Sequence, residues 1–267
     1  MKNLSKISNL IRFKMIEASH RSHVPHLASS LSCVDIIIYL YEVVLNIKNF
    51  SDINRDRFIL SKGHAANAIY SVLNYKKIIK DKDFRQYAKF GSKLEEHPSQ
   101  KIKGIEAATG SLGHGLPIAC GLALSSKLKK INNKTFVLIG DGECNEGTIW
   151  ESALFATAKH LDNLYVYLDH NKWQATGRNK DIIGLSSLSS KFKAFGWNVF
   201  EIDGNSYKEL DLSFKKALNF NKKKPTLFMC NTIKGKGVSF MEDDNNWHYK
   251  IPSVEDLEKA KKELHIK

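Results

Sequence analysis

The chain has 267 residues, of which 42% are hydrophobic and 26% charged, and its 41 basic residues against 28 acidic ones give a formal net charge of +13. This length suits one large α/β domain, or a domain with a small appendage. We find no apolar run that approaches the roughly 20 residues needed to cross a bilayer and no signal-peptide pattern, so we expect no membrane partner.

The basic excess does not by itself indicate a nucleic-acid-binding protein. Many of the lysines lie in short polar stretches, at residues 127–134 and 222–224, or near the C-terminus. No motif of a nucleic-acid-binding fold accompanies them. We therefore interpret the charge as a solvated surface, with attraction of phosphorylated substrates as a by-product, and expect no nucleic-acid partner. The four cysteines lack metal or disulfide spacing, which is typical of a cytoplasmic protein.

The first half of the chain shows helical periodicity followed by a strand. An amphipathic helix over the first twenty residues would have one apolar side, formed by Leu4, Ile7, Ile11 and Met15. Ser32 has the side chain of an N-cap, which predicts an apolar helix over residues 34–44. Further elements predicted here are a strand that starts at residue 57 and runs into a glycine turn within 57–65, and helices at 66–73 and 117–124.

The second half alternates short apolar runs with helical segments. Such runs, bounded by glycine, are typical of buried parallel strands. They occupy residues 135–139, 164–168, 197–202 and 226–232. Helices are predicted at 148–161 and, on the surface, at 255–267. The sequence thus predicts one α/β domain over residues 1–267, in which 250–267 is a C-terminal surface tail.

Two predicted strands end in residues that suit a divalent cation. Gly140-Asp141-Gly142 follows the first of them, and Asn171 lies just after the second. The glycines allow a tight turn and close approach of a ligand. One carboxylate and one amide oxygen at the carboxyl ends of two strands form a partial cage for Mg²⁺, with positions open for phosphate oxygens and water.

Several segments resemble motifs of the transketolase family, and they occur in the order typical of that family. These are residues 26–32, 60–65, 97–98, 109–115, 140–142 with Asn171, 234–242 and 247–248. The resemblance extends from about residue 5 to residue 250, and it is to the diphosphate-binding domain in its form as a separate N-terminal subunit. It implies a doubly wound, mainly parallel sheet with helices on both faces.

The resemblance also implies a cofactor and a set of site residues. The cofactor would be thiamine diphosphate, with Mg²⁺ held by Asp141, Asn171 and the Trp173 carbonyl. The cofactor-binding residues would be His64, Gly110, Leu112, Gly140, Asp141, Gly142, Glu143, Asn171 and His248. The catalytic residues would be His26, His64, His97 and His248, together with Glu146 at a dimer interface. Of these, His26, His97 and His248 would handle protons and sugar hydroxyls, to which a pKa near neutrality suits them. A shifted register would put His23 in the place of His26.

Three residues depart from the pattern of the family and leave details of substrate and cofactor binding open. They are His114, Thr176 and Tyr249. Many family members have glutamine, aspartate and glycine there, respectively.

The activity implied is transfer of a two-carbon ketol unit between sugars or sugar phosphates. In full-length transketolases a second domain contributes residues around the aminopyrimidine ring, so we expect this chain to be inactive alone and to form an α₂β₂ complex with a C-terminal subunit. Two alternatives stay open at this point. One is a subunit of a deoxyxylulose-phosphate-synthase-like or 2-oxoacid-decarboxylating enzyme, and the other is a non-catalytic scaffold.

Overall fold

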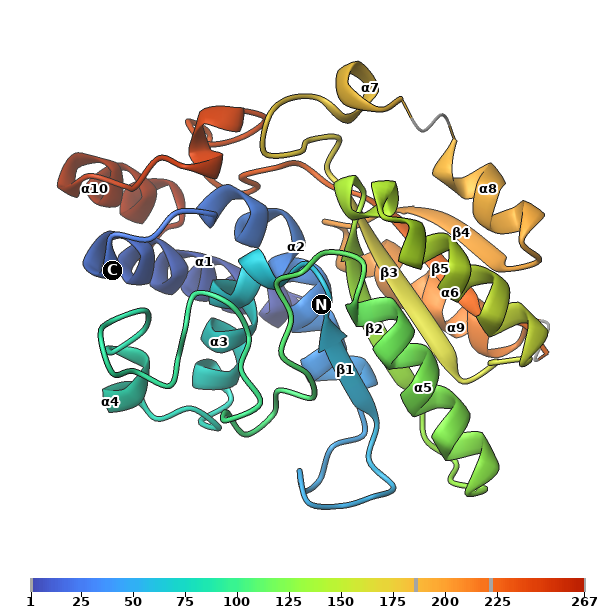
Figure 1. Cartoon of the computed structure of the whole chain (residues 1–267). Helices are drawn as coiled ribbons and strands as arrows, with labels where there is room; N and C mark the ends of the chain where they lie inside the picture. The colour runs from blue at the N-terminus through green and yellow to red at the C-terminus, as the bar shows by residue number, and fades with distance from the viewer. Residues whose placement is uncertain (1, 185–186, 221–222, 267) are drawn as a thin grey trace.

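The computed structural model describes residues 2–184, 187–220 and 223–266. Its centre is a five-stranded sheet with the order β1-β2-β3-β5-β4, in which every neighbouring pair is parallel (Figure 1). The strands are β1 (Arg57–Leu60), β2 (Thr135–Gly140), β3 (Leu164–His170), β4 (Asn198–Asp203) and β5 (Thr226–Asn231). Each predicted strand is confirmed, although β3 continues two residues beyond the predicted end at Leu168.

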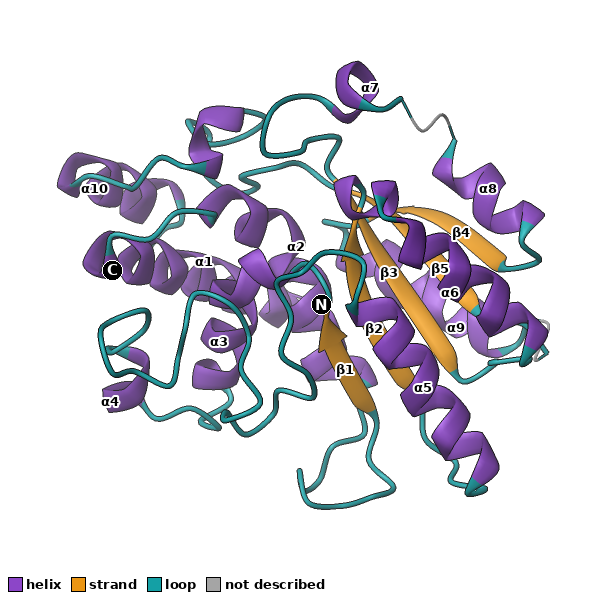
Figure 2. Cartoon of the chain, viewed as in Figure 1, coloured by secondary structure: helices purple, strands orange, loops and turns teal. Residues whose placement is uncertain are grey.

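Helices cover both faces of this sheet (Figure 2). The α-helices of the described residues are α1 (Lys2–Ser22), α2 (Leu27–Tyr39), α3 (Ala66–Tyr75), α4 (Asp81–Phe84), α5 (Gly115–Leu128), α6 (Gly147–Ala158), α7 (Asn179–Ile182), α8 (Leu188–Ala194), α9 (Tyr207–Leu218) and α10 (Val254–Glu263), of which α4, α7 and α10 lie away from the sheet. A π-helical turn, Leu40–Val44, extends α2, and short 3₁₀ helices occur at Gly63–Ala65, Gly142–Asn145 and Asn245–His248.

Alternate residues of each strand pack into two separate hydrophobic cores, one on each face of the sheet. On β2, Phe136 and Leu138 belong to the core shared with α1, α2, α3 and α9. Val137 and Ile139 belong to the core formed with α5, α6 and α8. Because successive side chains of a strand point to opposite faces, a strand that is buried on both faces must be apolar throughout. The predicted doubly wound α/β fold is therefore confirmed.

The most buried helix is α2, and its start differs from the prediction. It begins at Leu27, directly after His26, whose backbone is left-handed with φ of 66°. Ser32 is therefore inside the helix, and the prediction that it caps a helix starting at residue 34 was wrong. Its hydroxyl instead donates to Asp169 Oδ2 on β3, at 2.6 Å. The hydrogen-bond partner of Ser32 is a carboxylate far away in the sequence. The residues around Ser32 therefore could not reveal the role of its side chain.

One helical stretch, Leu27–Val44, is long and apolar enough to span a membrane by length and composition. This differs from the expectation that no run comes close to that limit. In the fold, 83% of the stretch is buried. Packing between α1, α3 and the sheet accounts for its apolar character.

One side of the C-terminal helix α10 packs against the rest of the fold. Ala260 and Leu264 are buried against the core that contains α1, and the Asn9 side chain donates to the Leu264 carbonyl at 3.2 Å. Ser253 and Asp256 form a capping box at its start, with N···O distances of 3.1 and 3.0 Å.

The capping box allows a test of whether α10 unfolds together with the domain. Replacing Ser253 with alanine removes an acceptor from the first helical turn, and we expect a loss of about 1 kcal/mol in the free energy of unfolding, measured in urea. Ser253→Asp retains an acceptor and should lose much less. Unchanged unfolding of the alanine variant would mean that α10 is a separate surface tail.

Candidate active site

A cavity of about 250 Å³ opens at the carboxyl ends of β1, β2 and β3. Every site residue predicted from the sequence lines it except Glu146. These residues are His26, His64, His97, Gly110, Leu112, Gly140, Asp141, Gly142, Glu143, Asn171, Trp173 and His248. Four lining residues were not predicted, namely Ser29, Lys62, Gln174 and Ala175. A larger cavity of about 530 Å³ shares Asp141 but contains none of the four predicted histidines.

Close packing of glycine loops shapes one wall of the cavity. A Cβ atom on Gly63 would lie 2.7 Å from the Gly110 backbone nitrogen, so these two loops meet through their main chains. Gly110 itself has φ of +148°, and a Cβ there would lie 2.9 Å from the His97 ring. Only glycine combines this backbone conformation with such an approach. The glycine thereby lets this loop pack closely against the His97 ring at the wall of the cavity.

Asp141 presents a buried carboxylate with no cationic partner. Its oxygens accept hydrogen bonds from the backbone nitrogens of Gly142 at 2.9 Å and Lys172 at 2.6 Å. Burial and, secondarily, the charge of Asp169 raise the pKa of Asp141 to about 6. None of the ion pairs within the described residues includes Asp141. The raised pKa means that the negative charge of Asp141 is unfavourable where it is buried, and a divalent cation would offset that charge. The carboxylate also keeps lone pairs with which to bind such a cation.

Asn171 is held in the orientation that a cation would need. Its Nδ2 donates to Asp169 Oδ2 at 3.1 Å and to the Ser32 hydroxyl at 3.3 Å. Its Oδ1 accepts from the Trp173 nitrogen at 3.0 Å, which leaves one lone pair of that oxygen available. Within the described ranges, no group of three or more His, Cys, Asp or Glu side chains is arranged to hold a metal. A cation here would depend on Asp141, Asn171, a backbone carbonyl and ligands from outside the chain.

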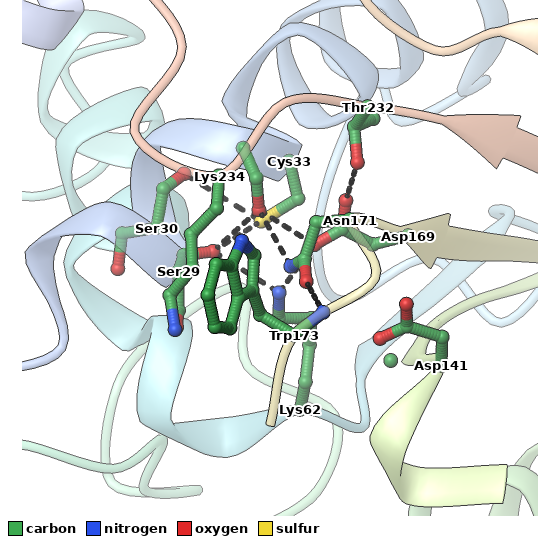
Figure 3. A network of polar contacts seen from close by, with 12 residues as sticks. Ser29, Ser30, Cys33, Lys62, Asp141, Asp169, Asn171, Trp173, Thr232 and Lys234 are labelled. Carbon is green, nitrogen blue, oxygen red and sulfur yellow. Dashed lines mark hydrogen bonds and ion pairs between the residues drawn. The ribbon is translucent and has the colours of Figure 1, made fainter. Parts of the chain in front are cut away.

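Asp169 is the centre of a buried network that the sequence did not predict (Figure 3). It is fully buried and accepts hydrogen bonds from Ser32, Asn171, Lys62 and Thr232. Lys62 is 2% exposed and also donates to the Ser29 carbonyl at 3.0 Å. Burial alone would lower the pKa of Lys62, but the adjacent Asp169 carboxylate outweighs it and the net shift is upward. Lys62 is therefore charged at neutral pH.

Lys234 is a second buried lysine near the cavity. Its ammonium lies 2.5 Å from Asn245 Oδ1 and 3.3 Å from His248 Nδ1. Burial, with a contribution from the charge of Lys62, lowers the pKa of Lys234 to about 8. An anion in the cavity would offset the unfavourable charge of Lys234, so this lysine fits a nearby diphosphate. The signal was available in the sequence, because both lysines lie within the family-like segments, but neither was assigned a role.

The four predicted histidines gather in one part of the cavity. The His26 ring centroid lies 5.6 Å from that of His64, 6.4 Å from that of His97 and 4.8 Å from that of His248. The expectation of a pKa near neutrality was wrong for His248. Burial, helped by Lys62, lowers the pKa of His64 well below its usual value, and burial with Lys234 lowers that of His248 to about 3. Both rings are neutral at pH 7 and can exchange hydrogen bonds with hydroxyl groups.

His26, rather than His23, faces this cluster. His23 is exposed and its ring approaches that of His20, with centroids 6.2 Å apart. Of the residues that depart from the family pattern, Tyr249 packs its ring 4.7 Å from that of His248, while His114 and Thr176 are exposed and line neither cavity.

The two glutamates are placed differently from the histidines. The Glu143 carboxylate is buried and accepts from the Ser61 hydroxyl and from the backbone nitrogens of Gly113 at 2.7 Å and Gly140 at 3.0 Å. The Glu143 carboxylate thus links three loops through the hydrogen bonds it accepts. Any contact of Glu143 with an anionic ligand would therefore have to come from its main chain. Glu146 is exposed at the start of α6, outside the cavity, and its assigned role at a dimer interface stays a prediction.

Comparison with known proteins identifies the family of this chain. Residues 4–267 match the family described as "Transketolase, thiamine diphosphate binding domain". The chain is 36% identical over 255 residues to an apulose-4-phosphate transketolase subunit of Phocaeicola vulgatus, covering 95% of this chain and 90% of that protein. It is 37% identical over 243 residues to a 6-deoxy-6-sulfo-D-fructose transketolase subunit of a Clostridium species, covering 90% of this chain and 88% of that one.

The fold comparison gives the same result. Transketolase from Campylobacter jejuni superposes with a TM-score of 0.92 at 29% identity, covering 99% of this chain and 43% of that one. The chain thus spans less than half of a full-length transketolase. These comparisons confirm the predicted family and its thiamine diphosphate-binding fold. The chain belongs to the transketolase family and corresponds to its thiamine diphosphate-binding domain.

Proposed function

We propose that this chain is the N-terminal subunit of a two-subunit transketolase, a transferase that moves a two-carbon ketol unit between sugars or sugar phosphates. The observation that carries the proposal is one cavity lined by the buried Asp141 carboxylate, the oriented Asn171 amide, the Lys62 ammonium and four histidines. A second buried lysine, Lys234, lies beside this cavity, next to His248. It is supported by relatives of nearly the same length that are named as transketolase subunits.

The proposed cofactor is thiamine diphosphate with Mg²⁺. When bound, thiamine diphosphate supplies the stabilisation of a carbanion that carbon–carbon cleavage requires. Asp141, Asn171 and the Trp173 carbonyl would hold the cation, and Lys62, Lys234 and His64 would neutralise or donate to the diphosphate. The buried setting strengthens each of these electrostatic contacts, since water does not screen them.

The remaining histidines act on the sugar in this proposal. His26, His97 and His248 would bind hydroxyl groups and move protons between them. Imidazole rings suit this work, because the neutral form of the ring has one nitrogen that donates and one that accepts. Two relatives are named for ketoses with an anionic group, and the +13 charge of this chain favours approach of such substrates.

The proposed assembly includes a second kind of chain. A C-terminal transketolase subunit would contribute the pyrimidine-binding domain, in an α₂β₂ complex in the cytoplasm, without nucleic acid or membrane. The test is an assay of ketol transfer by the purified chain with thiamine diphosphate and Mg²⁺, with and without that subunit. We expect activity only in the mixture, with ketose donors and not with pyruvate. Full transfer by the chain alone, or pyruvate decarboxylation by the mixture, would contradict the proposal.

A further inference from the structure

A glutamate that precedes His97 in the chain contacts His26 from outside the sheet. Glu96 Oε1 lies 2.8 Å from His26 Nδ1. The two side chains are 32% and 18% exposed, so the pair lies at the edge of the cavity and not deep inside it. His26 is fixed from its main chain as well, because its backbone nitrogen donates to the His248 carbonyl at 2.8 Å. The imidazole therefore has a defined position relative to the carboxylate.

The other groups around His26 are cationic or neutral. Its ring is flanked by those of His64, His97, His248 and Tyr249, with centroids between 4.8 and 6.4 Å away. The charge of Lys234 also acts on it. Burial lowers the pKa of His26, and the Glu96 carboxylate opposes that effect. His64 and His248 show no such carboxylate among the contacts of the described residues, and burial and positive charge act on both without opposition.

The contact has a definite consequence for the tautomer of His26. An ionised carboxylate can only accept hydrogen bonds, so the hydrogen of the neutral ring must be on Nδ1. The lone pair is then on Nε2. When Nε2 takes up a proton, the resulting imidazolium keeps its Nδ1–H donated to Glu96, and the nearby negative charge stabilises it. Return of that proton to a substrate oxygen restores the neutral ring.

We propose that Glu96 is a positioning residue that keeps the hydrogen of His26 on Nδ1 and so leaves Nε2 of this ring as its proton-accepting atom. Its catalytic consequence rests on the proposed function, whereas the tautomer and the basicity of His26 do not.

The direct test is ¹⁵N nuclear magnetic resonance of the histidine rings in the isolated chain, with His26 assigned by its loss in His26→Gln. The wild-type ring should have its hydrogen on Nδ1. In Glu96→Gln the amide oxygen can still accept from Nδ1, so the tautomer should persist while the pKa of His26 falls by about one unit. In Glu96→Ala the tautomer preference should be lost.

The neighbouring glutamate provides a matched control. Glu95 is half-exposed and its carboxylate lies 3.8 Å from Lys101, far enough into solvent to have little effect on the cavity. Glu95→Gln should change neither the tautomer nor the pKa of His26. A wild-type ring with its hydrogen on Nε2, or equal pKa values in wild type and Glu96→Gln, would overturn the proposal.

A second pair of measurements separates this proposal from the proposed function. Glu96→Gln should bind thiamine diphosphate in calorimetry as the wild type does, since Glu96 does not line the cavity near Asp141. In the active mixture, the acidic limb of kcat/KM against pH should move about one unit lower, because His26 then stays neutral to lower pH. A wild-type chain that does not bind the cofactor would refute the proposed function and leave the resonance result intact.

Discussion

Replacing Asp141 with alanine is expected to raise the dissociation constant for thiamine diphosphate in the presence of Mg²⁺ by more than about 100-fold. The reason is that Asp141 is the carboxylate of the proposed cation site, and the remaining ligands are an amide and a main-chain oxygen. Without that negative charge the cation loses its main electrostatic contact, and the diphosphate loses the cation. Isothermal titration calorimetry with and without Mg²⁺ measures the effect.

In the absence of metal, Asp141→Ala should not lower the stability of the fold. The pKa of Asp141 is raised by burial to about 6, from the ordinary value of 3.8. A carboxyl with a raised pKa binds more protons in the folded state, so its ionisation removes stability as pH rises from about 4 through 6. Above pH 6 the alanine variant should therefore unfold at the same temperature as the wild type or higher. Asp181→Ala, on the exposed helix α7, is the matched control for binding. Normal binding by Asp141→Ala would exclude the proposed cation site.

Replacing Lys62 with methionine is expected to lower the free energy of unfolding by about 3–5 kcal/mol. The variant leaves the Asp169 carboxylate fully buried and without its ammonium partner. Because Asp169 also orients the Asn171 amide, affinity for the cofactor should fall together with stability. Urea denaturation at pH 7 gives the first quantity and calorimetry the second.

A double variant and a surface control make this prediction specific. Adding Asp169→Asn to Lys62→Met removes the unpaired charge and should recover part of the lost stability. Lys77→Met breaks an exposed ion pair with Asp81, which solvent screens, and should change the free energy of unfolding little. A loss in Lys62→Met no larger than that in Lys77→Met would show that the buried pair does not stabilise the fold.

The sheet and the loops at its carboxyl ends could be predicted from the sequence because their signals are local. Runs such as residues 135–139 are apolar throughout and end in glycine, which is what a strand buried on both faces requires. The loops that follow carry the family-like motifs, and parallel strands bring them to one edge. For this reason the sequence alone was enough to place His64, Asp141 and Asn171 around one cavity.

What could not be predicted depends on contacts between distant segments. Ser32 has the composition of an N-cap, but Asp169, 137 positions later, determines its role. The pKa values of His64 and His248 follow from burial and from the nearby lysines, neither of which is visible in the spacing of residues. Glu143 was assigned to the diphosphate, yet its carboxylate is taken up by Ser61 and two backbone nitrogens. Such contacts appear only once the chain has folded.

The most direct test of the central claim is a crystal structure of the chain grown with thiamine diphosphate and Mn²⁺, which replaces Mg²⁺ and gives an anomalous signal. We expect one Mn²⁺ bound by the Asp141 carboxylate, Asn171 Oδ1 and the Trp173 carbonyl, with the diphosphate between that ion and the lysines at positions 62 and 234. An anomalous peak elsewhere, or a cofactor bound away from these residues, would contradict the account.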